Sequence, residues 1–173
     1  MYNTYPDNIQ EHSLQVAMIA HALALIRNRV FGGNINPERT AVLALYHDAG
    51  EVLTGDLSAP IKYFNPEIKI AYKAIESAAA QKLFTMVPEV LQADYHALFL
   101  ETEADRDHRD IIKAADKLSA YLKCLEELGA GNQEFSQAEK ALRASVEETG
   151  LPEVQYFLKT YVPSFKLTLD ELG

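Results

Sequence analysis

The chain has 173 residues, of which 48% are hydrophobic and 24% are charged. These values are typical of a globular domain with its own core, so they argue against a disordered or fibrous protein. The formal net charge of -9 argues against a broad basic face of the kind that binds long nucleic acids. Because we find neither a secretory leader nor an apolar run long enough to span a bilayer, we expect a cytoplasmic protein with no membrane partner.

Apolar residues recur at helical spacing along nearly the whole chain. The first predicted helix lies between a start signal at residues 7–8 and a stop signal at residues 32–33. The second covers residues 36–53, with Asn36 as its N-cap and Pro37 at its first position. We therefore expect two long helices in the first third of the chain.

Glycine and proline residues gather at positions 54–67, which predicts an ordered loop. Further helices are predicted at residues 67–87, 88–103, 107–131, 136–150 and 151–162. The pattern leaves open whether residues 164–172 form a terminal helix or an irregular segment. Since no run alternates with a period of two, we predict an all-α fold, a compact helical bundle without significant β-sheet, in one domain over residues 1–173.

A histidine and an aspartate, His47 and Asp48, stand together in the apolar second helix. On a continuous helix, Glu51 would lie one turn beyond His47 and share its face. Burying such groups is costly unless they are paired or bind a cation. A His-Asp pair that caps a neighbouring helix or bonds to core backbone would satisfy the same requirement, so further candidates are needed.

Two other helices supply such candidates. His12 opens the first helix, whereas His21, nine residues on, points about half a turn away and reads as a packed residue. Asp116 lies among apolar neighbours in the long helix at 107–131, where an unpaired carboxylate would be penalised. A buried salt bridge to Lys113 or Lys117 is the alternative for this aspartate.

Taken together, two imidazoles and two carboxylates come from three helices: His12, His47, Asp48 and Asp116. This mixture of nitrogen and oxygen donors suits Co²⁺, Mn²⁺, Fe²⁺, Ni²⁺ or Zn²⁺ better than Ca²⁺. The only cysteine, Cys124, lies beside helical apolar positions and is expected to be a packing residue rather than a catalytic thiol.

The order H…HD…D resembles the HD-domain superfamily of metal-dependent phosphohydrolases. The longer stretches EHSLQVAMIAHALA, YHDAGEVLTGDL and VPSFKLTLDEL resemble the YfbR-type 5'-deoxynucleotidases, and this resemblance extends over nearly the whole chain. The superfamily also contains triphosphohydrolases and cyclic-dinucleotide phosphodiesterases, so it is the block HDAGEVLTGDL that narrows the interpretation.

The resemblance implies that four residues hold a divalent metal: His12, His47, Asp48 and Asp116. It implies that Glu51 is the acid/base group acting on the attacking water and that Asp56 contacts the deoxyribose, while Lys62 is a weaker candidate for substrate binding. Co²⁺ is the metal we expect, with Mn²⁺, Fe²⁺, Ni²⁺, Zn²⁺ and Mg²⁺ as alternatives. The implied reaction releases phosphate from deoxyribonucleoside 5'-monophosphates, and the implied assembly is a homodimer.

Enzymes of this type carry an additional N-terminal segment with an Arg-Trp pair that contacts phosphate and sugar. The chain begins at Met1, after the position of that pair, so we expect that an upstream segment is missing or that a group such as Lys62 compensates. Three alternatives stay open: a triphosphohydrolase of the same superfamily, a nucleotide-binding module with impaired catalysis, and a structural helical protein. His96 is expected at the core or its edge, and His108 on a solvated surface.

Overall fold

The computed structural model describes residues 3–4, 8–55, 66–167 and 169–171. Within these ranges every regular element is helical, which confirms the all-α prediction. The α-helices are α1 (Ile9–Phe31), α2 (Pro37–Leu45), α3 (Glu51–Thr54), α5 (Pro66–Thr85), α6 (Glu89–Phe99), α7 (Arg106–Gly129), α8 (Ser136–Glu147) and α9 (Pro152–Thr160). Short 3₁₀ helices lie at Glu103–Asp105, Gln133–Phe135, Val162–Lys166 and Leu169–Glu171, so the C-terminal segment forms 3₁₀ turns rather than a longer helix.

Helix α1 begins and ends at the predicted signals. The Asn8 side chain accepts hydrogen bonds from the backbone N–H groups of Gln10 and Glu11, which are two of the donors that a helix start leaves unpaired. Gly32 ends the helix with φ +71°, a left-handed conformation that glycine adopts without steric cost. Asn36 caps α2 in the same way, by accepting from the N–H of Arg39.

The second helix is shorter than predicted, because α2 ends at Leu45 instead of continuing to residue 53. In a continuous helix the Ala44 carbonyl would accept from the N–H of Asp48. Here it accepts from the backbone N–H of His47 at 3.3 Å, and the Nδ1 atom of His47 lies 2.7 Å away. The chain therefore turns through residues 46–50 before the four-residue helix α3, and the prediction of one continuous helix was wrong.

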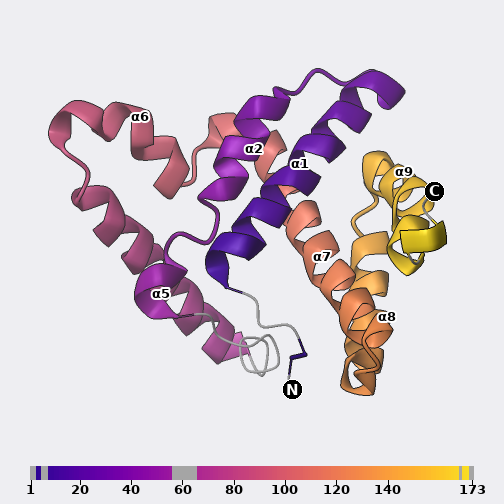
Figure 1. Ribbon diagram of the computed structural model, residues 1–173. Helices are drawn as coiled ribbons and strands as arrows, with labels where there is room; N and C mark the ends of the chain where they lie inside the picture. Colours follow the sequence, from indigo (N-terminus) through magenta and orange to yellow (C-terminus); the bar gives the residue numbers. More distant parts are fainter. Residues whose placement is uncertain (1–2, 5–7, 56–65, 168, 172–173) are drawn as a thin grey trace.

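The core lies where α1, α2, α7, α8 and α9 pack together, with α1 and α7 crossing at its centre (Figure 1). Its fully buried members include Leu23, Ile111, Leu118, Leu122, Val146 and Val154. Cys124 is also buried, and burial raises the pKa of its thiol to about 11, so it has the inert packing role that the sequence indicated.

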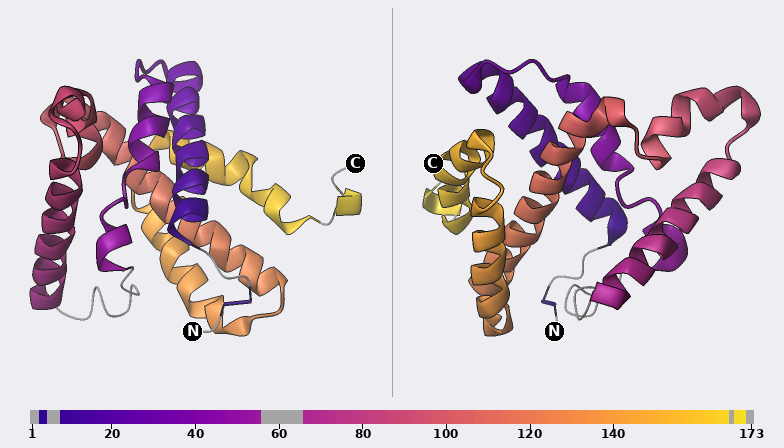
Figure 2. Two further views of the ribbon diagram at one scale, coloured as in Figure 1. Left: turned by 60° about the vertical axis from the view of Figure 1, so that its left-hand side comes forward. Right: turned by 180° about the vertical axis from the view of Figure 1, so that it is seen from behind.

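Helices α5 and α6 form a hairpin that extends away from this core (Figure 2). We call residues 66–99 the α5–α6 arm. Its large exposed apolar side chains are Ile70, Ile75, Met86, Val90 and Leu91. Among the described helices, none combines the length and the apolar character that crossing a membrane requires.

Candidate metal centre

Three elements bring the four predicted metal ligands together. The Nε2 atom of His12, in the first turns of α1, lies 3.5 Å from Oδ2 of Asp48 and 3.2 Å from Oδ1 of Asp116 on α7. His47 Nε2 lies 3.0 Å from the same Asp48 oxygen. The two imidazole rings are 5.4 Å apart between centroids.

Three of these residues form the tighter group. His12, His47 and Asp48 each offer one possible ligand atom, and these atoms all lie within 4.8 Å of one another. Asp116 contacts the group through His12, and its side chain is 46% exposed. A cation held by the three inner residues would therefore meet Asp116 on the side that opens to solvent.

The orientation of His47 identifies the nitrogen that faces the cluster. Because a carbonyl oxygen only accepts, the 2.7 Å contact with Ala44 requires the proton on Nδ1, which leaves the lone pair on Nε2 in the neutral ring. This Nε2 atom is buried and lacks an aligned hydrogen bond, although Asp48 Oδ2 is 3.0 Å away. We treat this contact as electrostatic: two acceptors face each other and need a positive charge between them.

In the metal-free chain, protons supply that charge. Hydrogen bonds to Asp116 and Asp48 raise the pKa of His12 to about 10 against the opposing effect of burial. Burial is the largest single influence on His47 and lowers its pKa, but Asp48, Asp116 and the Ala44 carbonyl together outweigh it and the net shift is upward. Burial disfavours the Asp48 carboxylate as well, yet its two histidine partners hold the pKa of this carboxyl well below its usual range.

Buried hydrogen bonds orient the ring of His12. The hydroxyl of Ser119, one turn beyond Asp116 on α7, donates to Oε1 of Gln15 at 2.6 Å. Its oxygen lies 3.4 Å from Nδ1 of His12 and is left to accept the Nδ1 proton. Nε2 of His12 then faces both carboxylates, as a metal ligand must. The sequence prediction missed Ser119, although its position three residues after Asp116 places it on the same helix face.

The donor set fits a divalent cation. Two imidazole Nε2 atoms with assigned outer partners and two carboxylates converge, and their charges are unbalanced without a proton or cation between them. Nitrogen and oxygen donors in this ratio indicate a divalent transition metal rather than Ca²⁺.

Glu51 is the first residue of α3 and is buried, with 8% of its surface exposed. Its backbone N–H donates to the carbonyl of Asp48 at 2.9 Å, so a single turn separates it from the cluster. The two predicted substrate contacts, Asp56 and Lys62, lie outside the described residues.

The remaining predicted histidines lie apart from the four-residue cluster. His108 is half-buried, and its Nδ1 lies 2.7 Å from the hydroxyl of Thr40, so the prediction of a solvated surface residue was wrong. His96 is exposed on the α5–α6 arm and meets Phe84 edge-on, with 5.5 Å between the centroids, so the prediction that it lies at the core or its edge was wrong. Lys117 donates to the carbonyl of Ser145 at 3.4 Å, whereas the ion pair described for Asp116 is with His12.

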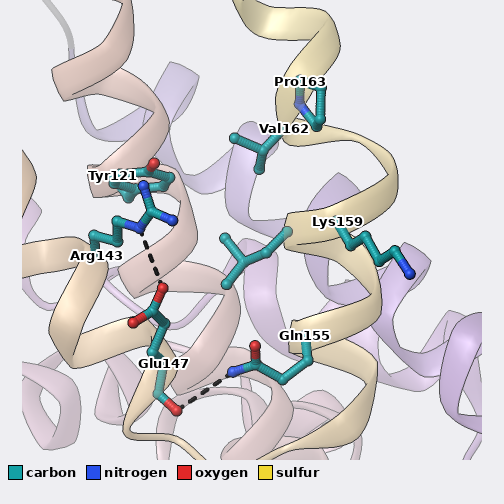
Figure 3. Close-up of a pocket in the computed structure, with 8 residues that line it drawn as sticks. Tyr121, Arg143, Glu147, Gln155, Lys159, Val162 and Pro163 are labelled. Carbon is teal, nitrogen blue, oxygen red and sulfur yellow. Dashed lines mark hydrogen bonds and ion pairs between the residues drawn. The ribbon is translucent and has the colours of Figure 1, made fainter.

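A cavity of about 410 Å³ between α7, α8 and α9 contains none of these residues (Figure 3). Tyr121 lines it, with Arg143 and Glu147 joined by an ion pair of 3.1 Å along α8. The His-Asp cluster lies outside this cavity.

The fold is that of the HD-domain phosphohydrolases. An HD-domain phosphohydrolase from Listeria innocua has the same fold with a TM-score of 0.80, over 95% of this chain and 79% of that chain, at 23% sequence identity. The profile of the YfbR-like 5'-deoxynucleotidases matches residues 1–165, and the chain belongs to that family.

Two relatives illustrate the family. A 5'-deoxynucleotidase of Vibrio parahaemolyticus is 55% identical over 173 residues, which is all of this chain and 89% of the relative. The 5'-deoxynucleotidase YfbR of Escherichia coli is 56% identical over the same length, which is 87% of that protein. The family resemblance that the HD pattern suggested is thus confirmed.

Proposed function

We propose that the chain is a metal-dependent 5'-nucleotidase that hydrolyses deoxyribonucleoside 5'-monophosphates to a deoxyribonucleoside and phosphate, and that residues 1–173 act as one HD domain. Relatives that bear the name 5'-deoxynucleotidase align with its full length at 55% and 56% identity. The observation that carries the chemistry is the 3.0 Å approach of the His47 lone pair to the Asp48 carboxylate, because it calls for a cation at that point.

In this proposal four residues hold the metal: His12, His47, Asp48 and Asp116. A bound divalent cation would supply positive charge to the phosphate and acidify the attacking water. Co²⁺ is the proposed ion, and the same donors would accept Mn²⁺, Fe²⁺, Ni²⁺, Zn²⁺ or Mg²⁺. The local cation also explains how a chain of net charge -9 could accept an anionic substrate.

Glu51 is the proposed acid/base group. Its carboxylate would take a proton from the water whose oxygen attacks phosphorus, and would pass that proton to the 5' oxygen as the bond from phosphorus to this oxygen breaks. Phosphate and a nucleoside alcohol result, with no covalent phosphoenzyme. Asp56 is proposed to contact the deoxyribose and Lys62 the phosphate or base. Nucleotide substrates also support a cytoplasmic location for the activity.

The proposed assembly is a homodimer in which a second copy covers the α5–α6 arm. The chain exposes 11006 Å², whereas a folded monomer of 19.3 kDa should expose roughly 8,500 Å². The excess is about 2,500 Å² per chain, or about 5,000 Å² for two copies, which is within the total area that obligate dimers bury. The arm exposes apolar residues such as Ile70, 71% exposed. Ile70→Lys should shift the sedimentation coefficient to that of a monomer, whereas Val30→Lys, at an exposed position on α1, should leave the dimer intact. A monomeric unaltered chain would sink the dimer proposal.

The enzymatic proposal is tested by identifying the product, phosphate, pyrophosphate or triphosphate, that is released from each of several nucleotides. Chelator-stripped protein, with single metals added back, is given 5'-dNMPs, 5'-NMPs, 3'-dNMPs and dNTPs. We expect metal-dependent release of a single phosphate from 5'-dNMPs. Release of triphosphate or pyrophosphate from dNTPs instead would favour another HD phosphohydrolase, and nucleotide binding without turnover would favour a binding module.

Glu51→Gln and Glu89→Gln form a matched pair of variants, because each glutamate opens a helix but only Glu51 is buried near the cluster. Glu51→Gln should lower kcat by about 10²-fold or more, the usual contribution of a general base, and should still bind metal. Glu89→Gln should keep full activity. Equal activity of the two variants would remove Glu51 from the mechanism.

A further inference from the structure

A partly buried ion pair, in which the Arg39 side chain is 34% exposed, joins α2 to α7 near the N-terminal ends of both helices. Nε and Nη2 of Arg39 donate to the two carboxylate oxygens of Asp105 at 3.1 and 2.9 Å. Asp105, directly before α7, is 6% exposed, and the hydroxyl of Thr102 donates to its Oδ2 at 2.8 Å. The forked geometry fixes the distance and the rotation of the two elements relative to each other.

A second polar contact lies beside this pair. Thr40, with no exposed surface, donates its hydroxyl proton to the carbonyl of Asn36 at 2.9 Å. Its oxygen is then left to accept from Nδ1 of His108 at 2.7 Å. Burial lowers the pKa of His108, which favours the neutral ring, and the contact with Thr40 then places its proton on Nδ1.

The same two elements carry metal-centre residues further along. Helix α2 rises about 9 Å from Arg39 to its last residue, Leu45, and His47 lies in the turn directly after it. Asp116 follows Asp105 by eleven residues, or about 16 Å along α7. A change in how the starts of α2 and α7 meet is therefore transmitted to the spacing between His47 and Asp116. Helix α2 packs mainly along α1, with α7 as its second neighbour, so the Arg39–Asp105 fork fixes the α7 side of its packing.

The Arg39–Asp105 pair should contribute more to the placement of the two helices than to the free energy of unfolding. Solvent screens the one-third exposed Arg39 guanidinium, and burial of the Asp105 carboxylate offsets part of the remaining attraction. An apolar replacement of the pair should therefore change stability little. We propose that Arg39 and Asp105, supported by Thr40 and His108, are positioning residues that set the register of α2 against α7 and thereby the metal affinity of the centre. This inference rests on the proposed metal site.

The test replaces the pair by apolar residues of similar volume, Arg39→Met with Asp105→Leu. The matched control is Arg143→Met with Glu147→Leu, an exposed arginine–glutamate pair of 3.1 Å within α8 (Figure 3). The stability of each metal-stripped protein is measured by urea unfolding. A separate folded sample is titrated with Co²⁺, whose visible absorption reports affinity and ligand geometry. Loss of a group that bonds directly to a metal ligand typically weakens binding 10–100-fold, and because Arg39 and Asp105 act through the helices we expect the lower end, about 10-fold.

The expected result is weaker Co²⁺ binding with an altered spectrum, while the urea midpoint stays close to that of the unaltered chain and the control keeps normal binding. Unchanged Co²⁺ affinity in the folded replacement would overturn the inference. Should the double replacement fail to fold, Arg39→Lys keeps the charge but loses the fork, and it must weaken Co²⁺ binding on its own.

The two proposals fail in different ways. Co²⁺ binding without phosphate release by the unaltered chain would sink the nucleotidase proposal and leave the role of Arg39 and Asp105 intact. No Co²⁺ binding by the unaltered chain would overturn both.

Discussion

Ser119 offers a test of whether the buried hydrogen bonds around His12 prepare it to bind metal. The side chain of Ser119 is 1% exposed, donates to Gln15 at 2.6 Å and lies 3.4 Å from Nδ1 of His12. Ser119→Ala removes both contacts and adds no bulk. The imidazole then loses the acceptor that keeps its proton on Nδ1, so Nε2 is less often available as a ligand.

Two magnitudes follow for Ser119→Ala. Leaving the partners of a buried hydroxyl unpaired costs about 1–3 kcal/mol of unfolding free energy. Losing the outer partner of a ligating histidine should raise the metal dissociation constant about 10–100-fold, which corresponds to roughly 1.4–2.8 kcal/mol. The two effects can be measured separately, because urea unfolding without metal reports the first and titration of the folded protein with metal reports the second.

The assay is calorimetric titration of metal-stripped protein with Co²⁺, beside urea unfolding without metal. Ser13→Ala is the matched control, because Ser13 is a buried serine next to His12, and no hydrogen bond from its side chain to the cluster is found in the described part of the chain. We expect weaker binding for Ser119→Ala alone. Equal Co²⁺ affinity for the two variants would refute the role assigned to Ser119.

Other predictions concern the core, acid stability and the thiol. Leu118→Ala, at a position with no exposed surface, should cost about 2–5 kcal/mol in urea unfolding, whereas Leu14→Ala, at 55% exposure, should change it by less than about 0.5 kcal/mol. The hydrogen bond from Arg39 lowers the pKa of Asp105, so the Asp105 carboxylate stabilises the fold at pH values above about 3.9, the pKa of an unfolded aspartate. This stabilisation is lost as the pH falls through the lower pKa of the folded state. Asp105→Asn should flatten that part of a curve of stability against pH. With its pKa near 11, the Cys124 thiol should resist iodoacetamide at pH 8 until urea unfolds the chain, and rapid native alkylation would contradict its burial.

The features predicted well from the sequence are those that depend on neighbouring residues. The start of α1 needs only Asn8, and its end only the left-handed Gly32, so both could be recognised without knowing the fold. Apolar neighbours singled out Asp116, although its side chain is in fact 46% exposed, and its place at the start of α1 made His12 a candidate. These two residues do meet, at 3.2 Å.

The features that sequence reasoning missed depend on contacts between distant residues. The half-burial of His108 follows from its contact with Thr40, which is 68 residues earlier in the chain. The role of Ser119 requires Gln15, 104 residues away. Apolar periodicity predicted α5 and α6 as helices, but it contains no information on whether a neighbouring element of the same chain covers their apolar faces.

The break after α2 explains how adjacent residues can serve one site. On a continuous helix, His47 and Asp48 would point about 100° apart, and neighbours in sequence do not face each other there. Because His47 Nδ1 and its N–H both take the Ala44 carbonyl, the helix ends at Leu45 and the chain turns, so that His47 Nε2 and Asp48 Oδ2 approach to 3.0 Å. The same side chain thus ends the helix with one nitrogen and faces the proposed metal with the other. Replacing His47 should therefore alter the backbone at residues 46–50 as well as metal binding, which a comparison of amide hydrogen exchange there in His47→Asn and Asp48→Asn would reveal.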